Sequence, residues 1–229
     1  MDDELPWRTE TFDLRAATDD EISAVVFDHP VVPGKTTAWW WAFDDAKVVI
    51  EPRRALAYMT NLFNAPEGLM DRYSAAQIDQ GFWFMYSAAA EDVFGRQLWN
   101  DAEPWDDRER CIRALPRLYQ ALFEPMLFLL EDYYASAMFM LPDFIVWMSR
   151  PRVTHDGADA LRVCQALLDA FGEMLGSSHD ATRTAALHGL GHLAHPDRAD
   201  VIRDFVRANP GLDPELRDYA ERAVVGDVL

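Results

Sequence analysis

At 229 residues, half of them hydrophobic, the chain can bury a sizeable core as one large domain or two small ones. Its net charge of −18 argues against nucleic acid as a partner, because phosphate binding needs a basic face, and against an anionic membrane surface. The same charge permits a basic protein partner, although its simplest role is to keep the protein in solution.

Three features of the sequence indicate where in the cell the protein is located: its cysteines, its N-terminal segment and its longest apolar run. Cys111 and Cys164 each lie in an amphipathic helical pattern, so we expect buried thiols and no disulfide framework. The chain opens with an acidic segment that lacks the apolar core of a signal peptide. The most apolar stretch, residues 133–148, contains Pro142 and Asp143 and falls short of the roughly 18 apolar residues of a membrane helix. We therefore expect a soluble cytoplasmic protein.

In chain order, the first two thirds show helical patterns on both sides of one poorly helical region. Thr18 is a good N-cap for a helix that opens with three carboxylates. Residues 30–52 contain prolines, a glycine and a β-branched run, which predict a long loop with one or two short extended pieces. The expected elements are an acidic N-terminal arm at 1–15, helices at 19–27, 53–63 and 75–90, a helical stretch at 111–123 kinked or restarted at Pro116 and Pro125, and a central buried helix or helix pair at 126–149.

The last third has a cleaner pattern. It predicts helices at 158–176, 180–194, 196–208 and 213–225, which end or begin at glycine and proline positions. Asp213 is a good N-cap for the last of these helices, and Pro214 suits its first helical position.

Two segments of this last third resemble each other. Residues 180–193 (DATRTAALHGLGHL) and 213–225 (DPELRDYAERAVV) each carry an arginine, an alanine three positions later and a small residue three further on. The offset of 34 residues, with one amphipathic segment in between, is typical of stacked helical hairpins.

Arg183 with Asp180, and Arg217 with Asp213, resemble the Asp/Arg ladder of HEAT repeats. Residues 180–225 are similar to a HEAT B-helix, A-helix, B-helix sequence, with 158–176 as the preceding A helix. This resemblance implies a binding scaffold rather than an enzyme. The C-terminal stretch is also similar to bacterial proteins, a resemblance that implies no activity. We expect an all-α fold, a single domain at 16–229 in which a helical bundle continues into HEAT-like α-α hairpins at 158–225.

Three histidines are candidate metal ligands. His188, His192 and His195 follow one another at spacings of four and three, so the first two lie on the same helix face. Two imidazoles at this spacing can chelate zinc, and we expect no other cofactor. The Gly-Leu-Gly between them lacks the glutamate of an HExxH motif. The structural alternative is that Gly189 and Gly191 let a neighbouring helix approach, so that the histidines form hydrogen bonds across the interface.

A tryptophan run and an acidic turn are candidate partner contacts. Trp39, Trp40 and Trp41 offer an aromatic anchor for a protein partner, although a lid over the helical core is the simpler interpretation. Asp106 and Asp107 lie in an acidic turn that suits a basic partner.

The remaining acidic residues and motifs give no clear catalytic signal. Glu131, Asp132 and Asp143 lie in an apolar setting, where a catalytic pair would need convergence in one pocket, and a turn with local hydrogen bonds is the simpler interpretation. The sequence contains no GxGxxG, P-loop or GxSxG motif, and Ser177 and Ser178 beside His179 carry no nucleophile signature.

Taken together, these features predict a non-catalytic helical scaffold that binds another protein. A basic partner suits the charge, as in an immunity- or inhibitor-like protein that neutralises a basic toxin or nuclease. Two alternatives stay open: a metal-binding protein or metal-dependent hydrolase centred on His188 and His192, and a structural subunit of a larger assembly with the apolar run at 126–148 partly exposed.

Overall fold

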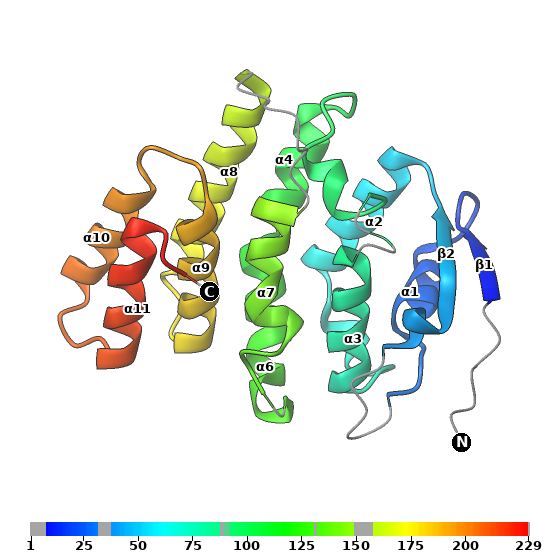
Figure 1. Cartoon of the computed structure of the whole chain (residues 1–229), viewed down its shortest axis with the longest axis horizontal. Helices are drawn as coiled ribbons and strands as arrows, with labels where there is room; N and C mark the ends of the chain where they lie inside the picture. The colour runs from blue at the N-terminus through cyan, green and yellow to red at the C-terminus, as the bar shows by residue number, and fades with distance from the viewer. Residues whose placement is uncertain are drawn as a thin grey trace.

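The computed structural model describes residues 8–31, 38–87, 90, 92–130, 132–148 and 158–228. The fold is all-α, as predicted, with one small parallel sheet at one end (Figure 1). The longer helices are α1 (Asp19–Phe27), α2 (Pro52–Asn64), α3 (Ala75–Tyr86), α4 (Trp105–Arg113), α7 (Ala137–Asp143), α8 (Ala158–Met174), α9 (Asp180–His192), α10 (Arg198–Ala208) and α11 (Pro214–Val225).

The helices follow one another across the molecule in two layers that keep the order of the chain (Figure 1). In one layer α1 packs on α3, α3 on α7, α7 on α9 and α9 on α11. In the other layer α2 packs on α4, and α4 packs on α8. One hydrophobic cluster contains side chains from Leu14 to Val228 and lies between the layers. Cys111 and Cys164 are buried in it and form no disulfide, as predicted.

The N-terminal arm is more ordered than its acidic composition suggests. Strand β1 (Arg8–Asp13) pairs in parallel with β2 (Phe43–Val49), which is one of the extended pieces expected within residues 30–52. Phe12 lies opposite Val48 in this pairing and contacts the Trp39 ring, with 5.9 Å between ring centroids. Residues 8–13 of the expected arm thus form a strand at the edge of the molecule.

The prolines of the middle segment restart the helix, as expected. Short helices α5 (Leu115–Leu118) and α6 (Glu124–Met126) have proline in the first helical positions, where the missing N–H is not needed. A π-helical turn, η4 (Tyr119–Phe123), joins them, and a 3-10 turn, η5 (Leu127–Leu129), follows. The segment from α4 to α6 thus forms an irregular rod that packs on α2 and α8.

The apolar run at 126–149 is buried only in part. Helix α7 and the π-helical turn η6 (Phe144–Met148) contribute core residues such as Met138, Leu141 and Ile145. The turn between α6 and α7 is open to solvent: Phe128 is 91 % exposed, Leu129 59 % and Tyr134 61 %. The expected central buried helix is therefore correct for α7 and wrong for the turn that precedes it.

The four C-terminal helices agree with the predicted boundaries to within a few residues. Asp213 caps α11 by accepting the N–H of Glu215 at 2.8 Å, and Gly226 ends this helix with a φ of 79°. Arg183 pairs with Asp180 at 3.0 Å. Arg217 donates to the carbonyl of Pro210 at 3.0 Å, so its expected pairing with Asp213 is not seen in the described part of the chain.

Candidate functional site

Helix α9 lies between α7 and α11, and glycine makes this close packing possible. A Cβ atom added at Gly189 would lie 2.7 Å from the Cβ of Pro142 in α7 and 2.8 Å from the ring of Phe171 in α8. At Gly191 it would collide with the side chain of Val228. The predicted approach of a neighbouring helix is therefore confirmed at Gly189, where it sets the distance between the side chains of α7 and α9, whereas at Gly191 the close neighbour is Val228, beyond the end of α11.

His188 is the buried centre of this region. His188 is 1 % exposed, and its Nδ1 forms a 2.7 Å hydrogen bond with the Tyr219 hydroxyl of α11. The Phe139 ring of α7 lies 4.5 Å away, centroid to centroid. Burial, together with a smaller effect of the neighbouring His192, lowers the pKa of His188 to about 4, so the imidazole is neutral at pH 7. Its Nε2 is buried and has no hydrogen-bond partner among the described residues.

His192 and Asp143 complete the group. Asp143 is the last residue of α7, and its Oδ1 lies 3.5 Å from His192 Nε2, one turn along α9 from His188. Burial raises the pKa of Asp143, and His192 opposes that shift. One ring nitrogen of each histidine and one oxygen of Asp143 all lie within 4.8 Å of one another.

His195 does not belong to this group, contrary to the predicted trio. Helix α9 ends at His192, and the next residue, Leu193, is extended at φ −69° and ψ 121°. The chain therefore turns away from the helix face, and His195 Nδ1 accepts the N–H of Asp197 at 3.2 Å. Asp143 takes the third place. The sequence singled out Asp143 for its apolar surroundings but did not connect it with the histidines.

A groove lies on the same three helices, with a volume of about 620 Å³. We call it the aromatic groove. Its aromatic residues are Tyr134, Phe139 and Tyr219, and its carboxylates are Asp180, Asp213, Glu215 and Asp218. Tyr134 is exposed, whereas Phe139 and Tyr219 are buried residues. Because Tyr219 lines the groove and binds His188, the groove and the histidine group share a wall.

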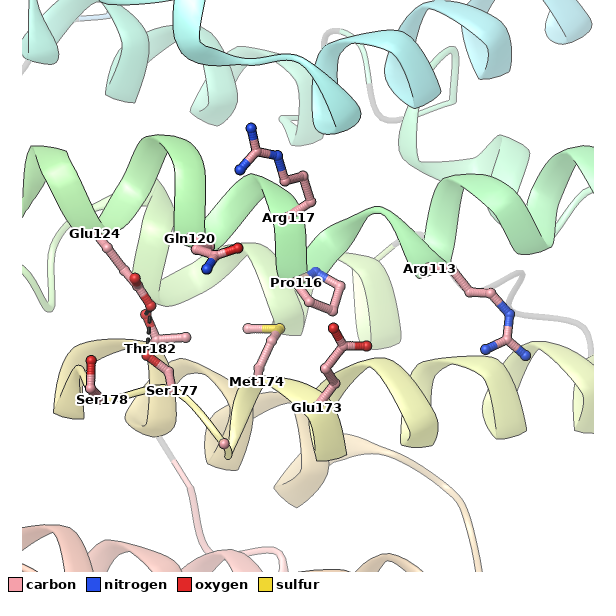
Figure 2. A pocket seen from close by; sticks show the side chains of 11 residues that line it. Arg113, Pro116, Arg117, Gln120, Glu124, Glu173, Met174, Ser177, Ser178 and Thr182 are labelled. Carbon is pink, nitrogen blue, oxygen red and sulfur yellow. Dashed lines mark hydrogen bonds between the residues drawn. The ribbon is translucent and has the colours of Figure 1, made fainter.

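A second pocket, of about 560 Å³, lies between the α5–α6 segment and the turn from α8 to α9 (Figure 2). Glu124 accepts hydrogen bonds from Ser177 at 2.6 Å and Thr182 at 2.9 Å, and its other oxygen lies 3.1 Å from His179 Nδ1. Ser177 thus donates to a carboxylate. These contacts fasten α6 to the α8–α9 turn.

Trp39 and Trp40 pack in or against the core, as the lid interpretation predicted. Trp40 is 8 % exposed, and Trp39 stacks on His29 with 3.6 Å between ring centroids. Trp39 also contacts Phe84, at 4.6 Å. Trp40 is therefore unable to anchor a partner. The side chain of Trp41 is outside the described part of the structure.

The acidic positions proposed for a partner differ from one another. Asp106 is exposed in the first turn of α4. Asp107 pairs with Arg110 in its own helix and with Arg53 of α2 at 3.4 Å. Asp132 accepts the N–H of Tyr134 at 2.9 Å, as expected for a turn, while Glu131 is not among the described residues.

Comparison with known proteins finds no matching family model, no matching curated protein and no matching solved structure. Among the described residues, no helix combines the length and the apolar character that a membrane crossing requires.

Proposed function

We propose that the protein is a non-catalytic helical scaffold that binds a basic segment of another protein in the aromatic groove. The observation that carries this proposal is the gathering of three aromatic residues and four carboxylates on α7, α9, α11 and the turn before α7. Arginine and lysine side chains are attracted both to the faces of aromatic rings and to carboxylates. A groove that offers both suits a basic segment better than an acidic or a purely apolar one.

The groove already shows how a guanidinium group can be held there. Arg222 of α11 places its guanidinium carbon 5.0 Å from the centroid of the Tyr219 ring, and it pairs with Asp218 at 3.3 Å. Both partners of this ion pair are largely exposed, and such pairs contribute only about 0–1 kcal/mol. An arginine of a partner can therefore replace Arg222 at Tyr219 and Asp218 at little cost.

The exposed rim supports a protein partner rather than a small molecule. Tyr134 stands 61 % exposed at one side of the groove, and tyrosine is enriched among residues that dominate binding energy at interfaces. The net charge of −18 speeds the approach of a basic protein. The exposed rim and the negative charge together suit an inhibitor of a basic toxin or nuclease, built on HEAT-like hairpins at 158–225.

Charge reversal in the groove tests the proposal. The double variant Glu215→Lys/Asp218→Lys should weaken binding of an arginine-rich peptide at low salt at least about tenfold, because it removes two carboxylates and adds two repelling charges. Asp71→Lys/Asp101→Lys is the matched control, since it changes the net charge equally at exposed positions outside the aromatic groove. Calorimetric titration measures both. Equal weakening by the two variants would mean non-specific attraction and would contradict the proposal.

The rim aromatic residue gives a second, charge-independent test. Tyr134→Ala should weaken binding of the same peptide, whereas Phe128→Ala, a change at an even more exposed ring of the same turn that does not line the groove, should not. A basic protein captured from a lysate of the source cells should depend on the same residues and should be released at high salt. If binding depends on Phe128 and not on Tyr134, the peptide binds outside the aromatic groove and the proposal is contradicted.

A second candidate function, a subunit of a larger assembly, is favoured by the exposed turn between α6 and α7. Phe128 and Leu129 are adjacent apolar side chains with little cover, in a chain whose other large apolar residues are mostly buried in the described part. Exposed apolar clusters of this kind often mark contacts with another chain.

A further inference from the structure

The group of Asp143, His188 and His192 contains a buried polar atom without a partner. His188 Nε2 is shielded from solvent and forms no hydrogen bond with any described residue. Buried nitrogen atoms of this kind cost free energy unless something binds them, and nearly all of those in folded proteins have a partner. The same group contains a second imidazole and a carboxylate, a set that suits a transition metal better than it suits an organic ligand.

We propose that Asp143, His188 and His192 form a binding site for a divalent metal ion of the zinc class. Zinc sites in proteins are tetrahedral, with bonds of about 2.0–2.2 Å to histidine nitrogen and carboxylate oxygen, which places ligand atoms about 3.4 Å apart. His192 Nε2 and Asp143 Oδ1 are already 3.5 Å apart. The third ligand atom lies within 4.8 Å of both, so the three atoms are already close to the separations that a tetrahedral site requires.

Tyr219 orients the first histidine for this role. A zinc-binding histidine commonly forms a hydrogen bond through its other ring nitrogen, which fixes the tautomer and the direction of the lone pair. His188 Nδ1 has such a bond with the Tyr219 hydroxyl, at 2.7 Å. When the Nδ1–H donates to Tyr219, Nε2 carries the lone pair that a metal ion needs. Tyr219 is therefore a positioning residue for the metal site.

The surroundings hold the ligands in place and leave one side open. His188 and His192 are one turn apart on α9, and Gly189 between them brings Pro142, the neighbour of Asp143, close to α9. His192 and Asp143 keep part of their side-chain surface in contact with solvent, at 26 % and 14 % exposure, so water can complete the coordination. The bound ion would tie the end of α7 to α9. This site is distinct from the proposed contact with a basic segment and does not depend on it.

Metal binding by the full chain tests the inference. Protein purified without a chelator or a histidine tag should contain about one zinc ion per chain, and metal-free protein should bind added Zn²⁺ with the same stoichiometry in calorimetry. His192→Ala and Asp143→Asn should each weaken this binding at least about tenfold, whereas His195→Ala, which removes a nearby imidazole outside the group, should leave it unchanged. Tyr219→Phe should weaken it by about 10–100-fold while leaving the stoichiometry intact.

Two further results bear on the outcome. Zn²⁺ should raise the midpoint of thermal unfolding of the wild-type chain and of His195→Ala, but not of His192→Ala, because an ion that binds the folded state stabilises it. Circular dichroism of each variant checks that the helices are intact, and His192, at the end of α9, is the substitution least able to disturb them. Absence of saturable binding by the wild-type chain, or equal binding by His192→Ala and His195→Ala, would overturn the inference.

Discussion

Asp79 shows how strongly a single carboxylate can depend on its place in the fold. It lies in α3, and its Oδ1 accepts the N–H of Ala137 at the start of α7, at 2.7 Å. Burial raises the pKa of Asp79 to about 6, and this one hydrogen bond only partly offsets the shift. The carboxylate therefore joins two helices at the cost of holding a charge away from water.

This pKa predicts the direction of a pH effect. The folded chain binds a proton at Asp79 more tightly than the unfolded chain does, so this residue makes the free energy of unfolding fall as the pH rises from about 4 to about 6. Asp79→Asn keeps an oxygen acceptor for Ala137 and removes the charge. We expect the variant to be more stable than the wild type by about 1–3 kcal/mol at pH 7.5, with a smaller difference at pH 5.

Urea unfolding of both chains at several pH values measures the difference directly. Comparing two chains that differ only at Asp79 cancels the contributions of the other titrating groups. A stability difference that does not change between pH 5 and pH 7.5 would contradict the raised pKa.

At the scale of elements, Gly189 controls the spacing of the histidine group. An added methyl group there would meet the Cβ of Pro142 and the ring of Phe171, both of which are held by the core. We expect Gly189→Ala to lower the free energy of unfolding by about 1–3 kcal/mol, as is usual for overpacking. Gly191→Ala is the matched control, because the nearest atoms to its added methyl group belong to the side chain of Val228, close to the end of the chain.

Thermal unfolding of the two glycine variants provides the measurement. Gly191→Ala should change stability by less than about 1 kcal/mol, since alanine favours the helix and Val228 can shift. Equal destabilisation by the two variants would mean that the α7–α9 contact does not depend on Gly189.

Elements with local signals were predictable, and elements that depend on distant partners were not. The boundaries of α8 to α11 follow from Gly176, Pro196 and Asp213, which act within a turn of their own position. Strand β1 has no such signal, because its parallel partner lies some 35 residues further on and no hairpin turn connects the two strands. The i,i+4 spacing identified His188 and His192, but Asp143 joins them only through the packing of α7 on α9.

At the scale of the whole molecule, the exposed turn at Phe128 and Leu129 is the clearest departure from a well-covered surface. We expect the isolated chain to self-associate at high concentration through this turn, because contact with a second apolar surface removes these side chains from water. The double variant Phe128→Ser/Leu129→Ser should remain monomeric. Size-exclusion chromatography with light scattering measures the molar mass of each.

Leu161→Ser is the control for this experiment, because Leu161 is another exposed leucine, on α8, and its loss should not change the association. A wild-type chain that is monomeric at every concentration would remove the support for the assembly-subunit function. It would leave the proposal for the aromatic groove unaffected.

The order of the helices in space has a consequence for how the protein is made. The helices pack in the order of the chain, so each contact can form once the later of its two helices has left the ribosome. The helices α7 and α9 emerge well before α11, which carries Tyr219. During synthesis, His188 is therefore uncovered until α11 docks. If the proposed metal ion binds, it can reach His188 in that interval from the side that Tyr219 later closes.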